Sequence, residues 1–116
     1  MLRTHTIVID RPAGSSHPRY PEFRYPLDYG YLDGTSGGDG NEIDVWCGSC
    51  DRSVLTGIVC TVDGVKRDAE VKLLAGCTAA EAETVLHAHN SGPQAAILVL
   101  NPRERTLRRD SGAVVS

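Results

Sequence analysis

The sequence has no long apolar segment and no excess of positive charge. No apolar run approaches the about 20 residues that a membrane-spanning helix needs, and residues 1–10 lack the apolar core of a signal peptide. The formal net charge is −3, with only two lysines, so electrostatics give no support for nucleic-acid binding. We therefore expect a cytoplasmic protein that binds neither membranes nor nucleic acid.

Aromatic residues and cysteines are also few. The aromatic content is 5%, and the four cysteines are Cys47, Cys50, Cys60 and Cys77. The cytoplasm keeps thiols reduced, so we expect these cysteines to be free. With 41% apolar and 23% charged residues, the 116-residue chain can bury one modest core. We expect a single domain over residues 1–116.

Residues 25–46, YPLDYGYLDGTSGGDGNEIDVW, combine closely spaced acids and glycines. Four acids fall within twelve positions, Asp33, Asp39, Glu42 and Asp44, and the glycines between them are Gly34, Gly37, Gly38 and Gly40. Glycine lets the backbone turn sharply and approach a ligand, so the segment predicts a loop that leads into a strand. Neighbouring carboxylates repel unless a cation or proton lies between them, and hard divalent cations prefer oxygen ligands. The pattern predicts a metal site, with a solvated acidic turn as the alternative.

This segment resembles the signature of the soluble (family I) inorganic pyrophosphatases. The family has Tyr-Pro-x-x-Tyr-Gly and then Gly-Asp-Gly-Asp-Pro-Leu-Asp. This chain has Tyr25-Pro26-Leu27-Asp28-Tyr29-Gly30 and then Gly38-Asp39-Gly40-Asn41-Glu42-Ile43-Asp44. Asn41 stands where the family has its central aspartate. The resemblance implies a mainly β fold with one or two helices, forming a small OB-like barrel that is closed or partly open.

The resemblance extends towards the N-terminus. Residues 4–10 are rich in β-branched side chains and predict a strand, and the run from Val8 to Ser15 resembles the family's opening strand and Pro-Ala turn. The family continues with Lys-Tyr-Glu and a hairpin that ends in a phosphate-binding arginine. Here Arg19 precedes Tyr20, and Arg24 leads directly into the signature, so the hairpin looks deleted. The resemblance implies that Arg19 or Arg24 binds phosphate; an exposed ion pair with Glu22 is the alternative for Arg24.

Three strands and a hairpin turn are predicted from the end of the acidic segment onwards. Residues 43–47 predict a strand, residues 54–62 a longer one with a bulge at Gly57, and Asp63-Gly64 a hairpin turn into a strand over 69–75. The family has two metal-binding aspartates and a phosphate-binding lysine in this hairpin. Asp63 and Asp68 keep the family's spacing, but the lysine would then fall at Glu70. Alternatively, Lys72 matches the family's lysine and Glu70 takes the second acidic position. Both alignments leave an acid and a lysine on one strand face.

A helix and further strands are predicted next. Thr78-Ala79-Ala80-Glu81 is a capping box that begins a helix ending near His89. Its apolar stripe consists of Ala82, Val85, Leu86 and His89. Residues 95–100 predict a strand, and residues 104–109 an exposed edge strand. The family's C-terminal phosphate ligands have no counterpart, so the resemblance covers about residues 7–74.

The resemblance implies Mg²⁺-dependent hydrolysis of pyrophosphate, with Mn²⁺ as a substitute metal. The implied metal ligands are Asp39, Asp44, Asp63, Asp68 and Glu70. The implied phosphate ligands are Tyr29, Lys72 and the arginines Arg19 and Arg24, and the implied catalytic set is Asp39, Asn41, Asp44 and Tyr29. In the family, the central aspartate is the base that activates the attacking water. An amide cannot accept that proton, so Asn41 predicts slow hydrolysis.

Other functions remain open beside the enzyme. The same fold could serve as an inactive module that binds pyrophosphate, a nucleotide or another small phosphate compound. Self-association of the chain is a further expectation. Trp46-Cys47-Gly48-Ser49-Cys50 resembles the redox site of thioredoxins, but a strand rather than a helix is expected after Cys50.

A zinc site is the remaining alternative for the cysteines. It would need Cys47 and Cys50 together with two ligands from Cys60, Cys77, His87 and His89, and one C-x-x-C supplies only half of a structural site. Since His87 and His89 are two positions apart on a helix, they cannot face one metal. We expect both to be helix-surface histidines.

Overall fold

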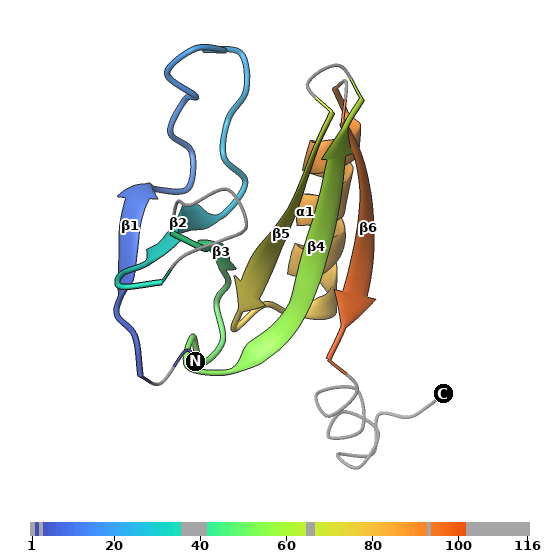
Figure 1. Cartoon of the computed structure of the whole chain (residues 1–116). Coiled ribbons are helices and arrows are strands. Elements are labelled where there is room, and N and C mark those ends of the chain that lie inside the picture. The colour runs from blue at the N-terminus through green and yellow to red at the C-terminus, as the bar shows by residue number, and fades with distance from the viewer. Residues whose placement is uncertain (1, 3, 36–41, 65–66, 93, 102–116) are drawn as a thin grey trace.

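The protein folds into one mainly β structure with a single helix among the described residues (Figure 1). The computed structural model describes residues 2, 4–35, 42–64, 67–92 and 94–101. The elements are β1 (Ile7–Arg11), β2 (Asp28–Leu32), β3 (Asp44–Cys47), β4 (Leu55–Asp63), β5 (Asp68–Ala75), α1 (Ala79–Asn90) and β6 (Gln94–Leu100). The predicted fold class is confirmed.

The six strands form one sheet in the order β1-β2-β3-β5-β4-β6. Neighbouring strands are antiparallel except for β3 and β5, which are parallel. In the described part of the chain, β1 and β6 are the two edges and do not pair with each other. The barrel is therefore open, with α1 packed behind β4 and β6 (Figure 1).

The helix and the β4–β5 hairpin form as their local sequence predicts. Thr78 Oγ1 accepts a hydrogen bond from the Glu81 N–H at 3.1 Å, and Glu81 Oε1 accepts one from the Thr78 N–H at 2.8 Å. The predicted capping box is thus confirmed. The β4–β5 register shifts between Leu55 and Gly57, which confirms the predicted bulge. No helix of the described residues is long and apolar enough to cross a membrane.

The strand β2 is a feature that the sequence did not predict. The segment around Tyr29 was expected to be loop, because its glycines and acids are typical of turns, and this expectation was wrong. β2 instead lies between β1 and β3. A side chain at Gly30 would overlap the Val8 carbonyl group of β1, so glycine is required for this close strand pairing.

The segment between β1 and β2 doubles back on itself (Figure 1). Ser16 and Arg24 form an isolated antiparallel bridge, and the His17 N–H donates to the Phe23 carbonyl at 3.0 Å. The hairpin that looked deleted is therefore replaced by a narrow turn-back. The strand predicted over residues 104–109 lies outside the described residues.

The sheet buries apolar side chains on both faces. One cluster lies between the sheet and α1 and contains Tyr25, Trp46, Val59, Leu74, Cys77, Ala82 and Val85. The cluster on the other face contains Leu2, Leu32, Val45, Cys47, Leu73 and Ala75. The parallel pair β3–β5 contributes to both clusters, as expected for a strand pair covered on both sides. Asp44 begins β3 and therefore lies at the edge of this core.

Candidate functional site

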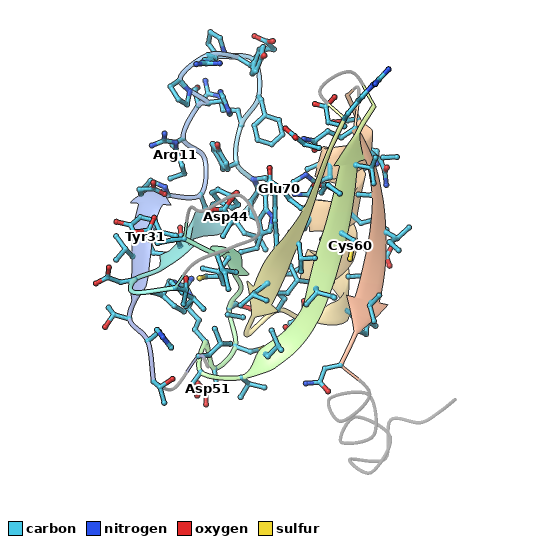
Figure 2. All side chains as sticks on the ribbon, in the orientation of Figure 1. Arg11, Tyr31, Asp44, Asp51, Cys60 and Glu70 are labelled. Carbon is cyan, nitrogen blue, oxygen red and sulfur yellow. The ribbon has the colours of Figure 1, made fainter. Side chains whose placement is uncertain are left out.

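The candidate site is centred on the ammonium group of Lys72. Lys72 is only 7% exposed. Its Nζ donates to Tyr29 Oη at 2.8 Å, to Asp44 Oδ2 at 2.9 Å and to Glu70 Oε2 at 3.3 Å. An ammonium group has three N–H donors, so each has an acceptor. The two carboxylates compensate the burial of the positive charge. Figure 2 shows Asp44 on β3 and Glu70 on the neighbouring strand β5 close together.

Strand register brings these residues together. In the parallel pair, Val45 lies opposite Leu73, so Asp44 and Lys72 are neighbours one position earlier on each strand. Alternation puts Glu70 on the same face of β5 as Lys72, as predicted. Tyr29 lies opposite Trp46 in the β2–β3 pair, which makes it the diagonal neighbour of Asp44. Three strands thus supply one polar cluster.

Tyr29 is a neutral hydrogen-bond donor in this cluster. Burial, followed by the negative charge of Asp44, raises the pKa of the Tyr29 hydroxyl far above its ordinary value. The hydroxyl donates to Asp44 Oδ2 at 2.6 Å while it accepts from Lys72. The hydroxyl therefore keeps its proton in neutral solution and can donate a hydrogen bond to an anionic oxygen.

A row of aromatic rings connects the cluster to the turn-back and to the helix. His17 stacks on Tyr25 with ring centres 6.2 Å apart, and Tyr25 stacks on Tyr29 at 5.3 Å. Tyr29 lies 4.5 Å from Trp46, and Trp46 lies 5.6 Å from His89. Tyr25 also lies 5.8 Å from Trp46, so the rings of Tyr25, Tyr29 and Trp46 pack against one another.

The two candidate arginines lie on the exposed turn-back. The Arg24 guanidinium donates to the Gly14 carbonyl at 3.2 Å, and the Arg19 backbone N–H donates to His17 Nδ1 at 3.0 Å. Both residues are exposed, and no contact in the described structure brings either guanidinium to Lys72. Their assignment to phosphate stays a prediction.

The other predicted acids are arranged unequally. Asp63 and Asp68 lie opposite each other at the end of the β4–β5 hairpin. Asp68 is four residues from Lys72, roughly 13 Å along a strand. Glu70, in contrast, contacts Lys72 directly. The geometry favours the alignment in which Lys72 is the site lysine and Glu70 takes the second acidic position. Asp39 and Asn41 lie outside the described residues.

The carboxylates of the described residues can be compared with the ligands that Mg²⁺ usually takes in proteins. Within the described residues, no group of three or more metal-ligating side chains lies close enough to hold an ion. Asp44 and Glu70 share Lys72 and offer two carboxylates. Mg²⁺ is commonly held by one or two carboxylates, with water and substrate phosphates completing its octahedron. The described donors therefore fit an Mg²⁺ ion that arrives with phosphate.

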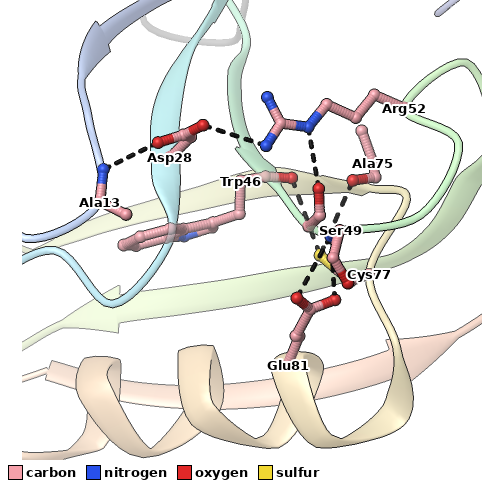
Figure 3. A network of polar contacts seen from close by, with 9 residues as sticks. Ala13, Asp28, Trp46, Ser49, Arg52, Ala75, Cys77 and Glu81 are labelled. Atoms are coloured by element: carbon pink, nitrogen blue, oxygen red, sulfur yellow. Dashed lines mark hydrogen bonds and ion pairs between the residues drawn. The ribbon is translucent and has the colours of Figure 1, made fainter.

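The C-x-x-C segment is held in place by a network of polar contacts (Figure 3). Arg52 donates to Asp28 at 3.0 Å and to the Gly48 carbonyl at 2.8 Å. Glu81 accepts from the Ser49 N–H at 3.2 Å. These contacts fasten the turn to β2 and to the first turn of α1.

The buried thiols of Cys47 and Cys77 do not have the environment of a redox site. All four cysteines are free, and Cys47 and Cys77 are buried. Burial raises the pKa of the Cys47 thiol and raises that of Cys77 to about 12. A reactive thiol needs a lowered pKa. Moreover, Cys50 leads into β4 rather than into a helix.

His89 is the site neighbour that the sequence interpretation missed. It was expected on the helix surface, but this was wrong: it is partly buried, and Trp46 Nε1–H donates to His89 Nε2 at 3.1 Å. The useful signal was its place in the apolar stripe with Ala82 and Val85, both of which are buried. His87 is exposed.

Solved structures share this fold. A scan against protein-family models gives no match, and a search of the curated proteins gives none either. The inorganic pyrophosphatase of the bacterium Helicobacter pylori superposes with a TM-score of 0.61 at 14% identity, over 91% of this chain and 92% of that one.

Two further inorganic pyrophosphatases are similar. The one from Neisseria gonorrhoeae has a TM-score of 0.57 at 17% identity and covers 90% of this chain and 87% of its own. The one from Coxiella burnetii has a TM-score of 0.55 at 15% identity and covers 86% of each. The chain therefore has the fold of these enzymes over nearly its whole length.

Proposed function

We propose that this protein hydrolyses inorganic pyrophosphate to phosphate with Mg²⁺. The observation that carries the proposal is the buried Lys72 held by Tyr29, Asp44 and Glu70. The resemblance of residues 25–44 to the pyrophosphatase signature and the shared fold support it. The reaction breaks one bridging P–O bond and forms a new P–O bond to the oxygen of water, which gives two phosphates.

The cluster supplies a cation and a donor for the anionic substrate. A phosphate oxygen at Lys72 would replace Asp44 or Glu70 as an acceptor, and the ammonium would then neutralise charge on the phosphate. The neutral Tyr29 hydroxyl would turn its hydrogen bond from Asp44 to a phosphate oxygen. Positioning and charge neutralisation of this kind provide most of the catalysis in phosphoryl transfer.

The carboxylates released from Lys72 would take a second role. Asp44 and Glu70, together with Asp39 from the acidic segment, would hold Mg²⁺. The ion would neutralise the negative charge that the substrate brings into the site. Asp63 and Asp68 are alternative ligands from the hairpin end, and Arg19 or Arg24 would hold the outer phosphate. Mn²⁺ would be a substitute metal.

Phosphate release from pyrophosphate in the presence of Mg²⁺ tests the proposal. We expect a slow wild-type rate and a loss of about 100-fold or more in Lys72→Met, since one buried donor to a developing anion is typically worth this much. Glu83→Gln, on the exposed face of α1, is the matched control and should match the wild type.

A binding module is the alternative that this assay separates. A wild type that binds pyrophosphate in calorimetry but releases no phosphate would refute hydrolysis and support a non-catalytic phosphate-binding role. The cytoplasmic location and the self-association of the chain stay predictions of the sequence.

A further inference from the structure

His89 makes two hydrogen bonds that determine which ring nitrogen carries its proton. Trp46 Nε1–H can only donate, so His89 Nε2 must be the acceptor. His89 Nδ1 then carries the hydrogen and donates to Gln94 Oε1, 3.2 Å away on β6. The imidazole is therefore held neutral and in one orientation between β3 and β6.

Trp46 transmits this orientation to the candidate site. Trp46 is 1% exposed, and its ring lies 4.5 Å from that of Tyr29 with a tilt of 59°. The His89 ring stands nearly perpendicular to the Trp46 ring, at 84°. A large rotation of the Trp46 ring would break its hydrogen bond to His89 and displace the ring surface against which Tyr29 packs.

The position of the Tyr29 hydroxyl depends on how the Tyr29 ring is held. The hydroxyl lies 2.6 Å from Asp44 Oδ2 and 2.8 Å from Lys72 Nζ. A displacement of about 1 Å in a positioned catalytic group can cost roughly 100-fold in rate. A residue that holds the ring can therefore matter as much as a residue that touches the substrate.

We propose that His89 is a positioning residue of this site, which holds Trp46 so that the Tyr29 hydroxyl stays directed at Asp44 and Lys72. The part of the inference that concerns catalysis rests on the proposed function. The His89–Trp46–Tyr29 arrangement itself is independent of it.

The surroundings of His89 favour the neutral ring. Burial lowers the pKa of His89; the Gln94 hydrogen bond opposes this shift, the positive charge of Lys72 adds to it, and Glu70 opposes it. The charges that shift this pKa thus lie on β5, and the hydrogen-bonding amide lies on β6. A protonated His89 would present N–H to N–H at Trp46 and lose the hydrogen bond.

The single tryptophan of the chain gives a direct readout. A protonated imidazole quenches a neighbouring indole, so Trp46 fluorescence in the wild type should fall as the pH is lowered below about 6.5, the ordinary pKa of histidine. His89→Gln should remove this transition. His87→Gln, an exposed histidine on the same helix, is the matched control and should keep it.

The kinetic test uses two substitutions at the same position. His89→Leu removes the acceptor and should lower kcat for pyrophosphate about tenfold or more, with a smaller change in KM. His89→Gln can still accept from Trp46 Nε1–H, and it should restore most of kcat. A purely structural role would instead lower stability in both variants and leave the kcat of the folded protein unchanged.

The outcomes separate this inference from the proposed function. If folded His89→Leu keeps the wild-type kcat, or if His89→Gln is as impaired as His89→Leu, the positioning role is refuted. If the wild type itself releases no phosphate, the proposed function fails. The fluorescence titration then decides the inference, and an unchanged transition in His89→Gln overturns it.

Discussion

Lys72 Nζ lies 2.9 Å from Asp44 Oδ2, across the parallel strand pair β3–β5. The two side chains differ in exposure, with 9% of the lysine and 33% of the aspartate side chain exposed. The Lys72 side chain is thus the more buried partner of the ion pair, and the Asp44 side chain is the more exposed one. In the state that the structure shows, the Lys72 ammonium is neutralised by the protein's own acids, and the proposed anionic substrate would have to compete with them.

The first prediction concerns this ion pair. Lys72→Met leaves the partly buried Asp44 and the exposed Glu70 without their shared cation, and we expect it to lower the free energy of unfolding by about 1–3 kcal/mol. Urea unfolding at pH 7 measures the change. The double variant Lys72→Met/Asp44→Asn should recover part of the loss, because it also removes the unpaired charge. This account would be contradicted if the double variant lost more free energy of unfolding than the two single variants lose together.

The second prediction concerns the metal. Calorimetric titration with Mg²⁺ or Mn²⁺ in the presence of phosphate should show binding that Asp44→Asn and Glu70→Gln each weaken. The combined change Asp63→Asn/Asp68→Asn should have a smaller effect, because this pair lies at the hairpin end. The opposite ranking would support the alignment in which Asp68 is the second acidic ligand.

A third prediction follows from Asp28. The Ala13 N–H and the Arg52 guanidinium hold the pKa of Asp28 below its ordinary value. Because the folded state binds this proton less tightly than the unfolded state, the stabilisation is present above the unfolded pKa of about 3.9 and is lost as the pH falls through the folded pKa.

Asp28→Asn tests this dependence. The variant should be less stable than the wild type at pH 7, and the difference should shrink as the pH is lowered towards 2. Urea midpoints over this range measure it, with the exposed Asp10→Asn as the control. A stability gap that stays constant with pH would show that the ionisation of Asp28 contributes nothing.

Local patterns predicted the elements whose signals lie within a few residues. The capping box at Thr78 located the start of α1, and the alternation after Asp68 placed Glu70 and Lys72 on one face. β2 was missed because the acids and glycines that follow it make residues 25–46 resemble a loop, whereas Gly30 is needed for the close approach of Val8. That requirement comes from a neighbouring strand and is invisible in local composition.

The site depends on contacts that are distant in sequence. Asp44 meets Lys72 only because β3 and β5 run parallel, a pairing that the order of the strands along the chain does not reveal. His89 meets Trp46 because α1 covers the same face of the sheet. The resemblance to a known signature placed Tyr29, Glu70 and Lys72 among the expected site residues together with Asp44, which periodicity alone could not do. Their roles stay predictions.

The last prediction concerns Asn41, which lies outside the described residues and replaces the aspartate that activates water in the pyrophosphatase signature. If the acidic segment works as that signature does, the wild type lacks a general base at this position. General-base assistance is typically worth about 10²- to 10⁴-fold. The family's C-terminal phosphate ligands have no counterpart in this sequence, so we expect only part of this gain in rate.

Asn41→Asp should raise Mg²⁺-dependent phosphate release from pyrophosphate by at least about tenfold. Asn41→Ala is the control, since it changes the same position without adding a base, and it should not raise the rate. The aspartate should also lower stability in the absence of metal, because a further anion joins Asp39 and Asp44. An unchanged rate in Asn41→Asp would mean that the segment does not act as a pyrophosphatase loop. A wild type that is already fast would point to Glu42, the neighbouring carboxylate, as the group that accepts the proton.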